Sequence, residues 1–118
     1  MRIIFILPDL GSGGAERVVS LLSGEIVKKG HHVDIIMMYG NRVQYQLHPK
    51  VSLFQLNLIG QSVWRRVKIL RKQLKSILGN DKAVVVPFQD SVLNTVLVAS
   101  LGLKVKVVAC ERNNPYIK

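Results

Sequence analysis

The sequence predicts an α/β fold: a doubly wound, mostly parallel sheet with helices on both faces. Two observations lead to this prediction. Short apolar runs alternate along the chain with stretches of helical periodicity, the pattern of a parallel sheet covered by helices. The first apolar run, residues 3–7, leads through the glycine-rich residues 11–14 into a helix start. Such a corner presents free N–H groups and the positive end of the helix dipole to an anion, most often phosphate.

Length and composition are those of one globular domain. The chain has 118 residues, of which 48% are hydrophobic, enough to form a core. Seventeen Lys and Arg against seven Asp and Glu give a net charge of +10, which attracts phosphates, anionic lipid or nucleic acid. A single cysteine, Cys110, excludes an internal disulfide and favours a reducing compartment. With no signal peptide and no run of about 18 apolar residues, we expect a cytoplasmic protein.

The first half of the chain predicts one helix and three strands. After the strand at residues 3–7, a helix at residues 15–29 has an apolar face and ends in two lysines and Gly30. The expected core-facing positions of this helix are Ala15, Val18, Val19, Leu22 and Ile26. A strand at residues 33–39, a polar loop at residues 40–50 and an edge strand at residues 51–56 follow.

The second half predicts two helices and two strands. Residues 61–78 and 90–101 have helical patterns, and Gly102 ends the second of them. Residues 83–87 and 105–110 are the strands, so the order is β-α-β-β-α-β-α-β. Ligands of doubly wound sheets bind at the carboxyl ends of the strands. Residues 11–16 and 111–115 both fall there, and we expect them to line one crevice.

The glycine pattern does not fit a dinucleotide-binding site. A G-x-G-x-x-G fingerprint started at Gly11 meets Gly13 but then Glu16 in place of the third glycine. The acidic residue expected near the end of the second strand is missing, since Asp34 lies near its beginning. A G-x-x-x-x-G-K-[ST] phosphate loop is absent as well. On spacing alone, a turn that merely joins strand to helix remains an alternative.

Three segments resemble one enzyme family. G-G-A-E-R at residues 13–17, K-G-H-H-V at residues 29–33 and V-V-A-C-E-R-N-N-P at residues 107–115 are similar, in this order, to segments of the retaining glycosyltransferases of family 4. These enzymes have the GT-B fold, which joins two Rossmann-like domains. The resemblance spans nearly the whole chain and implies a Rossmann-like N-terminal, acceptor-binding domain.

The resemblance also implies what the chain lacks. Family members bind the nucleotide-sugar mainly in a C-terminal domain with an E-x(7)-E motif, and no such domain is present in these 118 residues. We therefore expect no sugar transfer by this polypeptide alone. The implied reaction moves a sugar from a nucleotide-sugar to a glycan or a polyprenyl-linked acceptor, with no cofactor and no metal in this half.

Carried over to this sequence, the resemblance implies phosphate- and substrate-binding positions at Gly13, Gly14, Glu16, Arg17, Glu111, Arg112 and Asn113. The two glycines match those whose backbone approaches a diphosphate. Glu16 either contacts the acceptor or only complements the helix dipole, and Arg17 either reaches phosphate or is solvated. Arg112 cannot act as a base and is assigned charge stabilisation of phosphate. A local ion pair between Glu111 and Arg112 is the alternative. No residue of this half is assigned as catalytic.

The helix at residues 61–78 is strongly basic. Its expected core stripe is Val63, Val67, Leu70, Leu74 and Ile77, beside a cationic arc bordered by an aromatic residue. The cations of this arc are Arg65, Lys68, Arg71, Lys72 and Lys75, and Trp64 borders it. It suits an anionic membrane or a lipid-linked acceptor, or else is a solvated face. The alternative function is therefore a free-standing basic module that binds anionic membranes or nucleic acid without catalysis. Nucleic acid is not the expected partner, because no nucleic-acid signature is present.

The remaining polar residues favour structural roles. His31, His32 and His48 lack metal-ligand spacing and are expected to be structural or solvated. Residues 89–91 follow the fourth strand at the edge of the crevice, and we expect them to form the N-cap of the next helix. Asn94, one turn further, is a candidate for facing the cleft.

Overall fold

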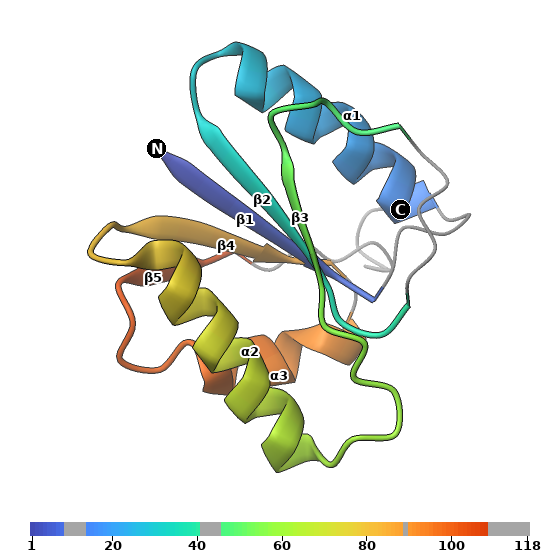
Figure 1. Cartoon of the computed structure of the whole chain (residues 1–118), viewed down its shortest axis with the longest axis vertical. Coiled ribbons are helices and arrows are strands. Elements are labelled where there is room, and N and C mark those ends of the chain that lie inside the picture. Colours follow the sequence, from blue (N-terminus) through green and yellow to red (C-terminus); the bar gives the residue numbers. More distant parts are fainter. Residues whose placement is uncertain (9–13, 41–45, 89, 109–118) are drawn as a thin grey trace, which may run out of the picture.

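A computed structural model describes residues 1–8, 14–40, 46–88 and 90–108 (Figure 1). Five parallel strands form one sheet in the order β3-β2-β1-β4-β5. The strands are β1 (Arg2–Leu7), β2 (His32–Met37), β3 (Ser52–Gln55), β4 (Ala83–Pro87) and β5 (Val105–Val107). The helices are α1 (Gly14–Lys28), α2 (Val63–Leu78) and α3 (Asp90–Ala99). The predicted fold class, element order and edge position of β3 are confirmed.

Helices cover both faces of the sheet. α1 lies on one face, and α2 and α3 lie together on the other (Figure 1). The β1–α1–β2 and β4–α3–β5 units run in opposite directions along the sheet. Because parallel crossovers are right-handed, opposite directions place their helices on opposite faces. The double winding is thus a direct consequence of the strand order.

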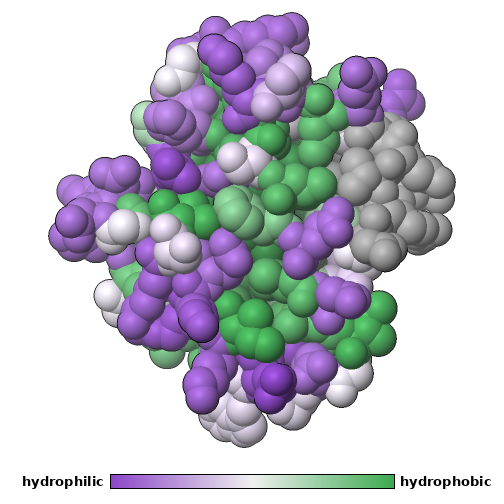
Figure 2. All heavy atoms as spheres, viewed as in Figure 1, coloured by the Kyte–Doolittle hydropathy of each residue, from purple (hydrophilic) through white to green (hydrophobic). Residues whose placement is uncertain are grey.

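Two hydrophobic cores lie on either side of the sheet. In β1, Ile4 and Ile6 face α2 and α3, whereas Phe5 and Leu7 face α1. All four side chains are buried, which explains why this strand is apolar without alternation. Between α1 and α2, apolar side chains reach the surface along the edge strand β3 (Figure 2).

α1 confirms the predicted helix within one residue at each end, but its apolar stripe is shifted. Val19 is fully buried as expected, whereas Leu22 is exposed, so its expected core position is wrong. Ser23 is fully buried instead, and its hydroxyl donates to the carbonyl of Ser20 at 3.0 Å. A serine can take this place because the backbone of its own helix satisfies its hydroxyl.

α2 begins two residues later than predicted. The hydroxyl of Ser62 accepts a hydrogen bond from the N–H of Arg65 at 3.3 Å, so Ser62 is the N-cap. Leu70, Leu74 and Leu78 are buried, but Val63 is 62% exposed and its expected core position is wrong. The helix diverges from the sheet toward its amino end (Figure 1), which leaves the first turn outside the core.

The remaining boundaries differ little from the prediction. β4 has the predicted bounds, and β2 and β3 are shorter than expected. α3 ends at Ala99, two residues early, and the positive φ of Gly102 (78°) lies in the turn that follows. The last two residues of the predicted fifth strand, 109 and 110, lie outside the described residues. None of the helices in the described parts combines the length and apolar composition that crossing a bilayer requires.

One ion pair connects β1 to β2 beside the core. Nη1 of Arg2 donates to a carboxylate oxygen of Asp34 at 2.8 Å, and the Asp34 side chain is 6% exposed. Burial raises the pKa of Asp34, and the Arg2 guanidinium opposes the rise without cancelling it. Asp34 thus has a structural partner at the amino end of the sheet.

Candidate functional site

The carboxyl edge of the sheet holds the candidate site. The direction of winding changes between β1 and β4, because β1 leads to β2 on one side and β4 leads to β5 on the other. At such a switch point the loops after the two strands separate and leave a crevice. Both helices that follow these strands, α1 and α3, therefore begin at this edge.

Backbone hydrogen bonds fix the strand ends at this edge. The carbonyl of Pro8 accepts from the N–H groups of Tyr39 at 2.9 Å and Gly40 at 3.1 Å. The N–H of Phe88 donates to the carbonyl of Ile6 at 2.9 Å. The main chain just before the predicted glycine loop is thus held in place from both neighbouring strands.

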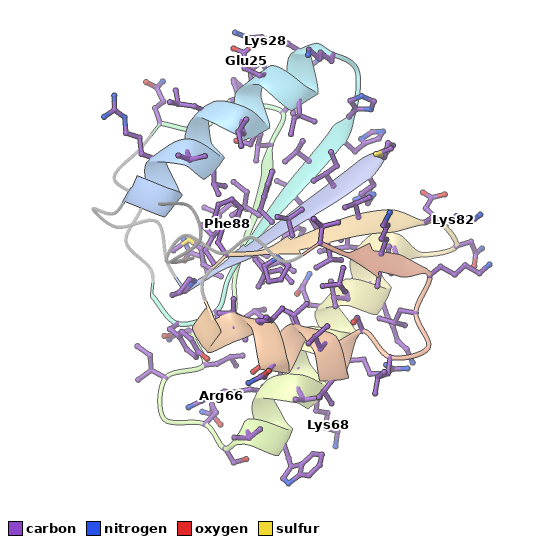
Figure 3. The ribbon with its side chains drawn as sticks, turned by 180° about the vertical axis from the view of Figure 1, so that it is seen from behind. Glu25, Lys28, Arg66, Lys68, Lys82 and Phe88 are labelled. Carbon is purple, nitrogen blue, oxygen red and sulfur yellow. The ribbon has the colours of Figure 1, made fainter. Side chains whose placement is uncertain are left out.

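An aromatic pair lies in the core next to this edge. The rings of Phe5 and Phe88 are tilted by 57° with centroids 5.9 Å apart, within the separation of favourable aromatic pairs. Both side chains are buried. Figure 3 shows Phe88 at the carboxyl end of β4, opposite Lys82 at the amino end. The pair belongs to the hydrophobic core on the α1 side of the sheet.

The first predicted phosphate segment lies at the amino end of α1. The helix begins at Gly14, so the N–H groups of its first turn have no partner within the helix. Arg17, three residues after Gly14, is exposed. Gly13 and the side chain of Glu16 lie outside what the structure describes, so their assignments remain predictions.

The second predicted segment follows β5. The N–H of Val108 donates to the carbonyl of Val85 at 2.9 Å, which continues the β4–β5 pairing one residue beyond β5. Glu111, Arg112 and Asn113 come next in the chain but lie outside the described residues. Their convergence with the segment at α1 is therefore still an expectation.

A cation that sequence reasoning missed lies near this edge. The guanidinium carbon of Arg66, on α2, lies 5.4 Å from the ring centroid of Tyr39, which follows β2. Its Nε is buried and has no hydrogen-bond partner among the described residues. Arg66 and Lys68 leave α2 on different sides (Figure 3). The helical angle could have separated Arg66 from the cationic arc, since it falls on the opposite side from Lys68.

The cationic arc on α2 divides into two groups. Trp64 is 79% exposed, and Arg65, Lys68, Lys72 and Lys75 are exposed as well. Arg71 is half-buried, and its Nη1 donates to the carbonyl of Ala99 at 3.1 Å and to that of Leu101. This guanidinium satisfies carbonyls at the carboxyl end of α3. Arg71 is therefore a structural link between α2 and α3.

The histidines and the polar residues near α3 form no cluster among the described residues. Nδ1 of His48 accepts from the N–H of Lys50 at 3.1 Å, and His32 is exposed at the start of β2. No group of three or more potential metal ligands occurs among the residues that the structure describes. Asn94 is exposed, whereas the side chains of residues 89–91 are outside the description.

Comparison with known proteins finds glycosyltransferases. No protein-family model matches the chain. Over its whole length it is 31% identical to a Campylobacter jejuni protein, of which it covers 34%. That relative is named GalNAc-alpha-(1->4)-GalNAc-alpha-(1->3)-diNAcBac-PP-undecaprenol alpha-1,4-N-acetyl-D-galactosaminyltransferase.

Two further relatives have names of the same class. An uncharacterized glycosyltransferase of Haemophilus influenzae is 24% identical over 87% of this chain, which covers 30% of that protein. An alpha-1,3/1,6-mannosyltransferase of Yarrowia lipolytica is 36% identical over 53% of this chain. The match covers 14% of that protein. The chain thus spans about a third of the length of the first two relatives.

Proposed function

We propose that this chain is the N-terminal, acceptor-binding domain of a retaining glycosyltransferase of the GT-B fold, family 4. The observation that supports it best is the switch point between β1 and β4, with α1 beginning at the same edge. Similarity over the whole chain to one named glycosyltransferase supports the same reaction class. The proposed reaction transfers a sugar from a nucleotide-sugar to a glycan or lipid-linked acceptor.

In this proposal the carboxyl edge binds phosphate. The backbone at Gly13 and Gly14 approaches a diphosphate, and Arg17 and Arg112 neutralise its charge. Glu16, Glu111 and Asn113 orient the acceptor beside it. Arg66 joins this set, because its guanidinium already lies over Tyr39 at the same edge and has a buried Nε to satisfy.

A second domain completes the proposed enzyme. It binds the nucleotide-sugar and contributes the E-x(7)-E motif, so the 118-residue chain alone transfers no sugar. The name of one relative, which contains PP-undecaprenol, supports a lipid-linked acceptor in this proposal. A diphosphate-linked acceptor also matches an edge suited to anions. The proposed place of action is the cytoplasm, at the membrane surface where a lipid-linked acceptor would be reached.

Binding of inorganic pyrophosphate tests the site without the second domain. We expect backbone amide resonances of residues 11–17 and 111–113 to shift in an NMR titration. Arg112→Ala should weaken binding about tenfold, the effect of one charge-assisted hydrogen bond. Lys82→Ala, at the opposite end of β4, is the matched control and should change little. Shifts confined to the lysines of α2 would contradict the proposed edge.

The coding sequence beyond Lys118 tests the larger claim. An open frame of about 200 further residues, the size of a second α/β domain, with an E-x(7)-E motif would support one two-domain enzyme. A stop codon after Lys118 would favour a half-enzyme completed by a separate subunit, or the alternative of a free-standing basic module. Pyrophosphate binding at the carboxyl edge separates these two, because only the half-enzyme requires it.

A further inference from the structure

The two edges of the sheet differ in charge. β5, at one edge, exposes Lys106, and Lys104 is exposed just before the strand. Lysines on an edge strand oppose pairing with another chain. β3, at the other edge, has no such protection, because no charged residue occurs between Lys50 and Arg65 in a chain of net charge +10. β3 is therefore the edge that is open to a further strand.

Backbone groups on the outer side of β3 are available for pairing. The N–H of Leu56 donates to the carbonyl of Met37, next to β3 on β2, at 2.9 Å. Successive residues of a strand turn their N–H and C=O groups to opposite sides, so those of Leu53 and Gln55 point away from β2. Within the described residues, β2 is the only strand paired with β3. The outward groups of Leu53 and Gln55 thus have no backbone partner in the described part of the chain.

The side chains of β3 leave apolar surface uncovered on both faces of the edge. Leu53 packs on the core beneath α1, whereas Phe54 and Leu56 pack on the core beneath α2 and α3. All three are only half-buried, and Ser52 and Gln55 are exposed. Figure 2 shows this strip of apolar side chains at the surface between α1 and α2. A strand added at the edge would cover it.

A second copy of this chain matches the edge. Two antiparallel β3 strands are related by a two-fold axis, so each copy presents the same groups to the other. With the axis at Phe54, Leu53 of each copy faces Gln55 of the other, and each of these pairs exchanges two hydrogen bonds. The two Phe54 side chains then form a non-hydrogen-bonded pair, in which side chains are closest. Uncharged residues meet uncharged residues, whereas cationic surfaces of two copies would repel each other.

We propose that two copies of this chain associate through antiparallel pairing of their β3 strands, in the register centred on Phe54. α1 and α2 lie on either side of β3 and leave its outer edge accessible (Figure 1). β3 has four residues, so the interface is smaller than a standard one and we expect a dissociation constant in the tens of micromolar. This association does not depend on the sugar-transfer reaction proposed above.

Sedimentation equilibrium of the intact chain tests the association. Over concentrations from about tenfold below to about tenfold above the expected dissociation constant, the mass should rise from 13.2 kDa toward twice that value. Amide hydrogen exchange tests the pairing itself. The N–H groups of Leu53 and Gln55 should exchange more slowly at the highest concentration. The N–H of Val107, which points outward at the β5 edge by the same alternation, should not change.

Two variants block the edge in different ways. Gln55→Pro removes an outward N–H, a position where an edge strand tolerates proline. It deletes one hydrogen bond in each of the two pairs and should raise the dissociation constant about 25-fold, from about fivefold for each bond. Ser52→Lys with Gln55→Lys introduces the protection that β5 has and should raise it at least about fivefold. Both residues are exposed, so circular dichroism should match the unsubstituted chain.

A matched control adds the same charge elsewhere. Ser76, on α2, and Asn80, just after it, are exposed, and Asn80 lies beside Leu103 at the β5 side of the molecule. Ser76→Lys with Asn80→Lys should therefore raise the dissociation constant much less than the lysine pair on β3. If Gln55→Pro disturbs the fold, the comparison of the two lysine pairs still tests the proposal.

Three results would overturn the proposal. One is a monomer over the whole concentration range, and another is association weakened equally by the lysine pair on β3 and by its control. The third is a dimer in which exchange at Leu53 and Gln55 does not slow, because the copies would then meet elsewhere. Loss of pyrophosphate binding with association intact would reject the proposed function and leave this interface standing.

Discussion

Removing the charge of Arg2 should destabilise the protein in a pH-dependent way. The Arg2→Leu substitution keeps an apolar stem beside the sheet but leaves the carboxylate of Asp34 without its 2.8 Å partner. Asp34 is 6% exposed, so water cannot replace the guanidinium fully. An unpaired buried charge is among the largest single-site penalties in proteins.

The magnitude follows from the burial of the two partners. Breaking a fully buried ion pair costs about 3–5 kcal/mol. The side chain of Arg2 is 23% exposed, so water has partial access to the pair and the penalty is smaller. We therefore expect a loss of about 2–3 kcal/mol in the free energy of unfolding at pH 7.

The pH dependence distinguishes a charge effect from a packing effect. Burial raises the pKa of Asp34, and Arg2 and His32 pull it down. Without Arg2 this pKa rises further, so the folded state holds its proton more tightly than the unfolded chain does. Protonated Asp34 therefore stabilises the folded state below the pKa of about 3.9 that the group has in the unfolded chain. This contribution to the free energy of unfolding is lost as the pH rises through the pKa of Asp34 in the folded state. The variant should thus approach the unsubstituted chain near pH 4.

Urea unfolding followed by circular dichroism at pH 4 and pH 7 measures both quantities. Arg2→Leu combined with Asp34→Asn serves as control, because it removes the charge that the single variant leaves unpaired. The combined variant should be more stable than Arg2→Leu at pH 7. Equal destabilisation by Arg2→Leu at the two pH values would refute the electrostatic reasoning and assign the effect to packing.

Four further substitutions test the packing and the backbone of the layers. Leu74→Ala removes a fully buried side chain and should lower the unfolding free energy by about 3 kcal/mol in urea titrations. Arg71→Met should cost about 2 kcal/mol by the same assay, since two carbonyls lose a charged donor; no loss would contradict its structural role. Gly102→Ala should lower the thermal midpoint, with a cost of about 1 kcal/mol at φ 78°. Gly24→Ala, inside α1 with ordinary room for a Cβ, should raise it.

The fold was predictable because its signals are local. The apolar run of β1 is buried on both faces, which requires a sheet covered on both sides. Gly30 and Gly102 have positive φ values just after α1 and α3, so the glycine stops in the sequence marked real turns. Helix ends and strand lengths were accurate to about two residues, the range over which fraying ends differ.

Three side-chain placements could not be predicted, because they depend on how the helices sit on the sheet. Leu22 and Val63 have the right spacing for a core stripe, yet one is displaced by Ser23 and the other lies where α2 leaves the sheet. Arg71 has the spacing of a surface cation, but the end of α3 lies within its reach. Periodicity gives a direction around a helix axis, whereas burial also depends on the distance of that axis from the sheet.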